Sequence, residues 1–308
     1  MPPVPLRYAA FATDPSGGNP AGVVLDALGM GDEEMLAVAA ELGYSESAFL
    51  FPRERPGHYD VRYFSPEAEV PFCGHATIAS GVALADAGAG ADAGTAGEVT
   101  LHTAGGPVSV VTGVDDEGWA TATLTSVEPC VTEAAPGLLS GTLAALGWTP
   151  EELDSSLPAR VAYAGAFHLI LAAASRDRLA RLSYDFAALK SVMLDRDLTT
   201  VDLVWREDAT TFHARNPFPV GGVVEDPATG AAAAAFGAYL RDIGAVSPPV
   251  DLLIRQGHDM GRPSELRVHV DTAYRPAIRV TGAAVPLSAT SPPPDARRAQ
   301  AAGWSPRP

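Results

Sequence analysis

Two stretches of the chain, 76–85 and 231–240, contain no charged residue and consist mostly of small and apolar side chains. A surface helix needs a polar face, whereas a helix that is apolar all round is buried. Each stretch begins within a related segment, Val70–Thr77 or Val224–Ala231, in which a proline precedes a glycine by three positions. The pattern therefore predicts two buried helices, each entered through a loop of similar design.

Strand-like runs and amphipathic helices surround both predicted core helices. We expect strands at 6–12, 21–25, 46–51, 59–64, 99–103, 108–112, 120–124, 161–164, 168–173, 201–205, 211–215, 250–256, 265–270 and 277–282. Further helices are expected at 33–42, 136–146, 176–182 and 185–194. Each half thus runs through strands, a polar turn, a buried helix and more strands. This order favours an internal duplication with a cleft between the halves, where ligands commonly bind.

Composition narrows the choice of partners and compartment. The 308 residues carry 37 acidic and 21 basic side chains, a net charge of -16, which argues against nucleic acid and anionic membrane surfaces as partners. No apolar run is long enough for a membrane span, and the first residues do not resemble a signal peptide. Two cysteines, Cys73 and Cys130, are too few for a disulfide framework, so we expect a cytoplasmic protein.

The starts of the two predicted core helices are candidate anion sites. Free amide donors and the positive end of the helix dipole attract negative groups there. Gly230 would let a ligand approach the backbone closely. Two such helix ends facing each other would hold a small anionic substrate from both sides.

Four side chains are candidates for chemistry: Glu46, and in the two loops Cys73, His75 and Asp226. Glu46 enters an apolar strand, where desolvation raises the pKa of a carboxyl towards that of a general acid or base; the alternative is a structural glutamate at a turn. Cys73 at a helix start can be an activated thiol or a small buried hydrophobe. His75 can carry a proton or bond to the backbone. Asp226 can act on substrate or, like Thr229, cap the helix.

Several common sites are not indicated. The seven histidines are scattered and lack H-x-x-x-H spacing, so we expect no metal site. No G-x-G-x-x-G follows a predicted strand, and neither a Walker A sequence nor a G-x-S-x-G elbow occurs. Nucleotide-binding, nicotinamide-dependent and elbow-type hydrolase functions therefore lose support.

Taken together, the motifs resemble the PhzF-like family, the phenazine-biosynthesis isomerase group of the diaminopimelate-epimerase superfamily. The resemblance covers about residues 5 to 285. The matching segments, in family order, are Gly18–Gly22, Ser45–Phe49, Arg62–Pro66, Cys73–Thr77, Glu225–Gly230 and Gln256–Ser264.

The resemblance implies an α/β (α+β) fold of two similar diaminopimelate-epimerase-like domains. Each would be a curved sheet or barrel around a central helix, with the site in the cleft between them, no cofactor and a homodimeric assembly. We expect the first domain at 1–118, completed by a returning strand at 276–288, and the second at 119–275. The proline-containing tail, 289–308, is expected to be disordered.

The resemblance also assigns roles to individual residues. Glu46 would be the acid and base, with His75 and Asp226 assisting proton placement. Substrate contacts would come from Asn19, Ser45, Cys73, Gly74, Thr229, Gly230 and Ala231.

The chain departs from the family pattern in two ways. Cofactor-free racemases of the superfamily use one cysteine per loop, but here only Cys73 fits, because the second loop carries Asp226 and Cys130 lies elsewhere. Phenazine-type members commonly have serine where this chain has Ala231, so a hydroxyl that would touch the phenazine precursor is missing.

From these observations we expect an isomerase of a small cyclic unsaturated amino or carboxylic acid. It would shift a double bond by moving a proton, without a cofactor, in secondary-metabolite biosynthesis such as antibiotic or phenazine-type pathways. One alternative is an amino-acid racemase or epimerase that uses Cys73 with a non-cysteine partner. A second alternative is a non-catalytic small-molecule binder of the same fold.

Overall fold

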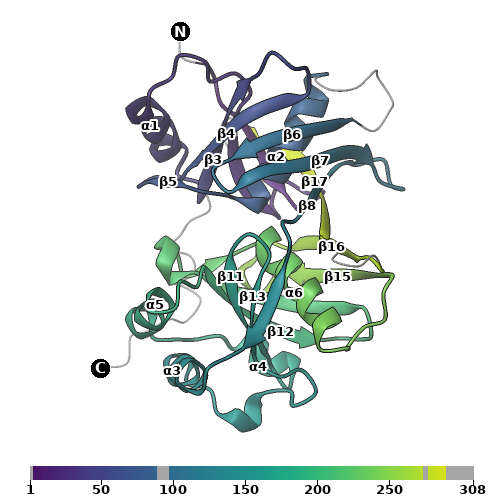
Figure 1. Ribbon diagram of the computed structural model, residues 1–308. Coiled ribbons are helices and arrows are strands. Elements are labelled where there is room, and N and C mark those ends of the chain that lie inside the picture. Colours follow the sequence, from purple (N-terminus) through teal and green to yellow (C-terminus); the bar gives the residue numbers. More distant parts are fainter. Residues whose placement is uncertain (1–2, 89–96, 273–276, 289–308) are drawn as a thin grey trace. The chain divides into compact units, whose positions relative to one another are not determined.

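The computed structural model describes residues 3–88, 97–272 and 277–288, and the predicted disordered tail lies outside the described residues. The chain divides into two compact units (Figure 1). Unit 1 takes its described residues from Met1–Thr125, Arg262–Glu265 and Arg279–Pro294, and unit 2 from Ser126–Gly261 and Leu266–Ile278.

Unit 1 is a closed barrel. Its strands are β1 (Leu6–Ala10), β2 (Asn19–Val24), β3 (Glu46–Pro52), β4 (His58–Phe64), β5 (Glu69–Val70), β6 (Glu98–Thr103), β7 (Gly106–Val114), β8 (Ala120–Thr125) and β17 (Arg279–Pro286). Pairing runs β1-β2-β3-β4-β6-β7-β8-β17 and returns to β1, with β2–β3 and β4–β6 parallel and the other pairs antiparallel. Closure leaves no exposed sheet edge along this ring.

The predicted boundary between the domains needs correction. Strand β8 was expected in the second domain, after residue 118, but it belongs to unit 1. The reason is that β8 pairs with both β7 and β17 and so completes the ring.

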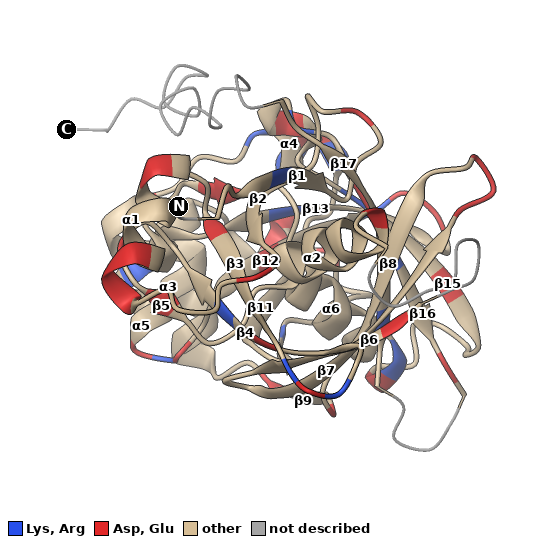
Figure 2. Ribbon diagram, turned by 90° about the horizontal axis from the view of Figure 1, so that it is seen from above, with Lys and Arg blue, Asp and Glu red and all other residues tan. Residues whose placement is uncertain are grey.

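Helix α2 (Gly74–Asp86) fills the barrel, and its residues from Gly74 to Leu84 are all buried. It packs against β1, β2, β3, β7, β8 and β17. Gly81 permits the close approach, because a Cβ there would lie 2.8 Å from Val110 Cγ1 and 2.9 Å from Ala122 Cβ. The first predicted core helix is therefore confirmed, and its lack of a polar face follows from its place inside the sheet. Helix α1 (Asp32–Leu42) lies on the outside and carries three acidic residues in its first turn (Figure 2).

Unit 2 repeats this connectivity. Its strands are β9 (Cys130–Glu133), β10 (Arg160–Tyr163), β11 (Phe167–Ala172), β12 (Thr200–Arg206), β13 (Thr211–Pro217), β14 (Glu225–Asp226), β15 (Val250–Gln256) and β16 (Ser264–Val270), the last beginning with two residues of unit 1. The parallel pair β11–β12, the antiparallel pair β12–β13 and the parallel pair β13–β15 match β2–β3, β3–β4 and β4–β6. The short β14 pairs with the end of β13 as β5 pairs with the end of β4.

Helix α6 (Gly230–Asp242) is the counterpart of α2. It is buried from Ala232 to Leu240 and packs against β9, β10 and β11. Both helices are drawn almost wholly in the tan of uncharged residues (Figure 2). The internal duplication expected from the two apolar runs is thus present in the order and pairing of the elements.

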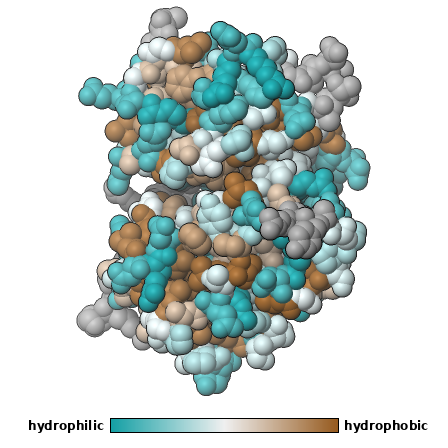
Figure 3. Space-filling model, viewed as in Figure 1, coloured by the Kyte–Doolittle hydropathy of each residue, from teal (hydrophilic) through white to brown (hydrophobic). Residues whose placement is uncertain are grey.

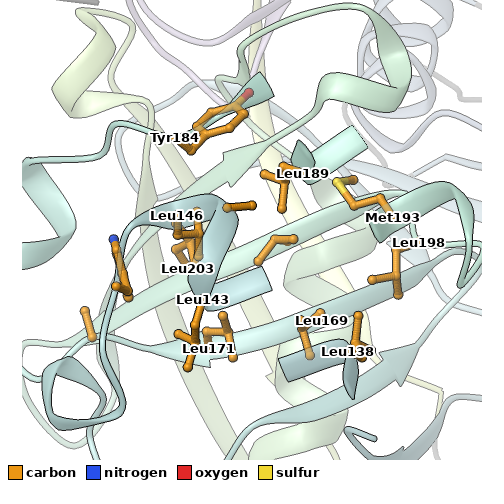
Figure 4. Close-up of a cluster of buried hydrophobic side chains, with 14 of the residues drawn as sticks. Leu138, Leu143, Leu146, Leu169, Leu171, Tyr184, Leu189, Met193, Leu198 and Leu203 are labelled. Carbon is orange, nitrogen blue, oxygen red and sulfur yellow. The ribbon is translucent and has the colours of Figure 1, made fainter. Parts of the chain in front are cut away.

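The outer helices of unit 2 cover one face of its sheet. These are α3 (Pro136–Leu146), α4 (Arg176–Ala180) and α5 (Phe186–Leu194), with the short 3-10 turns η1 (Pro150–Glu152), η2 (Pro219–Gly221) and η3 (His258–Met260). Leucines of α3 and α5 meet leucines of β11 and β12 in a separate buried cluster (Figure 4). The visible surface of each unit mixes hydrophilic and hydrophobic residues (Figure 3). Among the described residues, no helix has the length and apolar character that a membrane crossing requires.

Candidate functional site

Three candidate residues of unit 1 meet where β3 begins and α2 starts. Glu46 is the first residue of β3 and pairs with Ala21 of β2, while Cys73 is the N-cap of α2. The Cys73 sulfur lies 3.6 Å from Oε2 of Glu46, and Nε2 of His75 lies 3.5 Å from the same oxygen. Sγ of Cys73 lies 3.3 Å from Nδ1 of His75. We call Glu46, Cys73, His75 and their neighbours Asn19 and Ser45 the N-terminal cluster.

Burial moves the two titratable groups of the cluster in opposite directions. Desolvation raises the pKa of Glu46 above its ordinary value, although hydrogen bonds from Ser45 and Cys73 oppose the shift. Desolvation lowers the pKa of His75 to about 3, so the imidazole is neutral at physiological pH. The contact between Glu46 and His75 is therefore a polar contact to a neutral ring rather than a salt bridge.

Asn19 selects the tautomer of His75. Nδ2 of the Asn19 amide lies 3.0 Å from Nδ1 of His75. Because an amide nitrogen can only donate, Nδ1 accepts this hydrogen bond and carries no proton. The ring proton then sits on Nε2, which faces Oγ of Ser45 at 3.4 Å and the Glu46 carboxyl. The neutral ring therefore offers a donor to the carboxylate form of Glu46.

The loop before Asn19 is held by a residue that the sequence analysis did not single out. The Arg262 guanidinium donates to the carbonyl oxygens of Gly17 and Gly18. Neither glycine can carry a side chain, because a Cβ would lie 2.5 Å from the Pro263 carbonyl oxygen at Gly17 and 2.6 Å from the Ala10 carbonyl oxygen at Gly18. This packing explains why Gly17 and Gly18 are both glycines, and it fixes the start of β2.

The first turn of α2 is fixed from inside the barrel. Thr77 Oγ1 donates to the Cys73 carbonyl oxygen at 2.7 Å and lies 2.6 Å from the hydroxyl of Tyr63, which is fully buried on β4. These two contacts hold the Cys73 carbonyl group at the start of the helix.

The candidate residues of unit 2 form a separate group at the start of α6. Thr229 is the N-cap and donates from Oγ1 to Oδ2 of Asp226 at 2.6 Å. The capping role that the sequence left open for Thr229 is not observed, because its side chain makes no capping hydrogen bond. Gly230 and Ala231 follow as the first two residues of the helix. We call Asp226, Thr229, Gly230, Ala231 and Gln256 the C-terminal cluster.

Gln256 is the member of this cluster that the sequence analysis missed. It is 1% exposed, and its side-chain amide donates to the Asp226 carbonyl oxygen at 2.7 Å and to Oγ1 of Thr229 at 3.0 Å. Its side-chain oxygen accepts from the Thr229 amide at 3.1 Å. The available signal was its place at the end of a strand and the start of a matching motif. A neutral side chain with no reactive group gave no further reason to select it.

The structure corrects the comparison of the two loops. Gly74 begins α2 after Cys73, and Gly230 begins α6 after Thr229, so the residue that corresponds to Cys73 is Thr229 and not Asp226. The other cysteine, Cys130, is exposed on β9. A hydroxyl thus stands where a second thiol would be needed.

The chain matches one protein family over most of its length, with the phenazine biosynthesis-like family PhzC-PhzF covering residues 8–290. It is 33% identical over 297 residues to a protein of Mesorhizobium japonicum named as an isomerase, covering 92% of this chain and 96% of the relative. It is 31% identical over 259 residues to the trans-2,3-dihydro-3-hydroxyanthranilate isomerase of Pseudomonas fluorescens, covering 83% and 86% of the two chains.

A solved structure gives the same result for the fold. The PhzF-family phenazine biosynthesis protein of Bacillus anthracis superposes with a TM-score of 0.82 at 26% identity, covering 92% of this chain and 96% of that one. The resemblance drawn from the motifs and the predicted fold class are both confirmed. The chain belongs to the PhzC-PhzF family of phenazine biosynthesis-like proteins.

Proposed function

We propose that this chain, an isomerase of the PhzC-PhzF family, shifts a double bond in a small cyclic unsaturated amino or carboxylic acid by moving one proton. The observation that carries the proposal is the N-terminal cluster, in which a buried carboxyl with a raised pKa contacts a neutral imidazole. General acid–base catalysis works best when the pKa of the group lies near the working pH.

The proposed step uses one carboxyl in both directions. Glu46 as carboxylate removes a proton from the carbon next to the double bond, and the electron pair of that C–H bond forms the new double bond. The original double bond shifts by one position, and its terminal carbon takes the proton back from the Glu46 carboxyl. Nε2–H of His75 stabilises the carboxylate form of Glu46 before the proton is taken up and after it is returned.

Substrate binding is proposed at the helix starts. The amides of Gly74 in unit 1 and of Gly230 and Ala231 in unit 2 begin helices whose positive ends favour a carboxylate. Asp226, held by Thr229 and Gln256, would receive a polar or ammonium group of the substrate and assist in placing the proton. Ser45, Asn19 and Thr229 would complete the substrate contacts.

The choice of substrate class rests on a relative. The Pseudomonas fluorescens relative is named for trans-2,3-dihydro-3-hydroxyanthranilate, a cyclic unsaturated amino acid. We propose the same chemical class here, in secondary-metabolite biosynthesis of the antibiotic or phenazine type. We also propose a cytoplasmic location, from the low cysteine content, and a homodimer, from the family resemblance; light scattering on the purified chain tests the dimer.

An isotope experiment tests the proton transfer. The substrate is deuterated at the migrating position and turned over in ordinary water, and the product is analysed by NMR. Because the Glu46 side chain is only 11% exposed, we expect part of the label at the new carbon, since a shielded site limits proton leakage. Complete exchange with solvent accompanied by stereochemical inversion would instead indicate two bases on opposite faces.

A racemase or epimerase remains the second candidate because Cys73 lies inside the N-terminal cluster. Thr229 at the corresponding position and the exposed Cys130 weigh against a paired-thiol reaction. Cys73→Ser distinguishes the two functions: a folded variant with measurable isomerase activity supports the carboxyl mechanism. Complete loss of activity in a folded Cys73→Ser protein would favour the epimerase.

A further inference from the structure

A chain of buried polar side chains links three strands of unit 2 and takes no part in the proposed proton transfer. It consists of His168 on β11, Thr200 and Asp202 on β12, and Asn216 on β13, each at most 2% exposed. Nδ1 of His168 lies 2.7 Å from Oγ1 of Thr200, which donates to Oδ1 of Asn216 at 2.6 Å. Nδ2 of Asn216 donates to Oδ1 of Asp202 at 3.0 Å. We call these four residues the buried network.

The hydrogen bonds of the buried network have a defined direction. The Thr200 hydroxyl has a single hydrogen, and because it is given to Asn216, Nδ1 of His168 must be the donor in its contact with Thr200. Burial lowers the pKa of His168 to about 3, so the ring is neutral and its one proton sits on Nδ1. Both ends of the Asn216 side-chain amide are therefore held, the oxygen by Thr200 and the nitrogen by Asp202.

The buried network lies on the face of the sheet that meets α6. Leu169 of β11 and Leu203 of β12 belong to the cluster beneath α3 and α5 (Figure 4). Side chains alternate between the two faces of a strand, so the network residues of these strands point to the opposite face. On β13, Phe212 packs against Phe236 of α6 with ring centroids 4.9 Å apart. Asn216, four residues further along, shares the face of Phe212.

The backbone of Asn216 connects the buried network to the C-terminal cluster. In the short ladder between β13 and β14, Asn216 pairs with Asp226 and Pro217 pairs with Glu225. Proline has no amide hydrogen, so of these two residues of β13 only Asn216 can donate to β14 from its backbone. Holding the Asn216 side chain at both ends therefore also fixes the strand residue opposite Asp226.

We propose that Asn216, held between Thr200 and Asp202, is a positioning residue that sets the backbone of Asp226 and hence the direction in which its carboxyl meets the substrate. This inference rests on the proposed role of Asp226 in substrate binding. Thr200 begins β12 as Glu46 begins β3, so unit 2 carries a neutral hydroxyl where unit 1 carries its carboxyl. A hydroxyl there cannot replace a carboxyl base, which favours a supporting role for the network.

A double-mutant cycle tests the positioning role. The kcat/KM of Asn216→Leu, Asp226→Asn and the combined variant is compared on one verified substrate. Asn216→Leu keeps the approximate size of the side chain but removes both hydrogen bonds, and we expect kcat/KM to fall roughly 10–100-fold, as misplacement of a substrate-contacting group does. Because both changes then act through Asp226, the combined variant should match the worse single variant to within about twofold. Losses that multiply would contradict the proposal.

Two further variants separate positioning from a general loss of stability. Tyr239→Phe is the matched control, because it removes one hydrogen bond of a fully buried side chain of unit 2, from the Tyr239 hydroxyl to the Pro158 carbonyl oxygen; its kcat/KM should not change. If Asn216→Leu fails to fold, an exchange decides. Asn216→Asp places two carboxyl groups together, and adding Asp202→Asn restores one amide–carboxyl hydrogen bond. The exchanged pair should recover most of the lost kcat/KM, and no recovery would overturn the proposal.

A measurement without substrate separates this proposal from the proposed function. Nitrogen NMR should show His168 as a neutral ring with its proton on Nδ1, and Asn216→Leu should shift the backbone amide resonance of Asp226. A proton on Nε2 of His168 would overturn the proposal, because Thr200 would then donate to the ring and not to Asn216. If the NMR results hold but Asp226→Asn keeps full activity, the substrate role of Asp226 is wrong and the positioning of its backbone stands.

Discussion

The same burial drives Glu46 and His75 towards their uncharged forms. Desolvation raises the pKa of the Glu46 carboxyl and lowers the pKa of the His75 imidazole to about 3. An isolated charge is costly in such a place, and a carboxyl whose pKa is raised by burial holds a proton more firmly than an exposed carboxyl does. The feature of the N-terminal cluster that favours proton transfer is therefore the burial of Glu46 beside a ring that stays neutral.

Burial of Glu46 also predicts a pH-dependent change in stability. Because the folded-state pKa is raised above the unfolded value, the contribution of Glu46 is fully present below the unfolded pKa and is lost as pH rises through the folded pKa. Glu46→Gln has no charge to bury. Its unfolding free energy should therefore increase relative to that of the unmodified chain as pH rises from about 4 to 8. Denaturant unfolding at a series of pH values measures this difference.

Glu41→Gln, on the exposed side of α1, serves as the control and should show no such trend. If the unfolding free energy of Glu46→Gln minus that of the unmodified chain stays constant or falls as pH rises, the assignment of a raised pKa to Glu46 is contradicted.

The alanine at position 231 predicts a low kcat/KM for the phenazine precursor. It is the second residue of α6, at the position where phenazine-type members commonly have serine. A hydrogen bond to a charged group is worth about 1.5–3 kcal/mol. Ala231→Ser should therefore raise kcat/KM for trans-2,3-dihydro-3-hydroxyanthranilate, whereas Ala231→Cys, of similar size but a weak donor, should not. Efficient turnover of that compound by the unmodified chain would count against this reading.

At the scale of elements, the two core helices were predictable because an element without a polar face must be buried. The burial of Glu46 was predictable for the related reason that its strand is apolar. The contacts among Glu46, Cys73 and His75 were not, since they depend on where the start of β3 lies relative to α2. Gln256 and Arg262 were not predicted from the sequence, because they donate hydrogen bonds to loop carbonyl groups. That role leaves no pattern in the local sequence.

The fit of α2 inside its barrel gives a prediction for this element. Gly81→Ala would place a methyl group 2.8 Å from Val110 Cγ1 and 2.9 Å from Ala122 Cβ. Overpacking of this kind costs about 1–3 kcal/mol, which thermal or denaturant unfolding would register. Gly137→Ala on α3 is the matched control, because a Cβ there meets nothing within 4 Å. Equal stability of Gly81→Ala and the unmodified chain would show that the packing around α2 is looser than described.

At the scale of the whole molecule, unit 1 is completed by chain segments from far along the sequence. Strand β17 pairs with β1 and β8 to close the barrel, and Arg262 holds the loop before β2. Hydrophobic patterns locate strands but do not say which strands pair, so the predicted boundary at residue 118 separated β8 from its partners. The repeated connectivity was easier to foresee, because both halves present the same order of strands, turn and apolar helix.

The central claim is that Glu46 carries the proton. The most direct measurement compares the turnover of Glu46→Gln with that of Glu41→Gln on one verified substrate, with ligand binding and unfolding followed in parallel. Glutamine keeps the size of the side chain and removes the base, so we predict a fall in kcat of roughly 10²–10⁴-fold, the usual worth of general acid–base catalysis, in a protein that still folds. Full activity of Glu46→Gln would contradict the account.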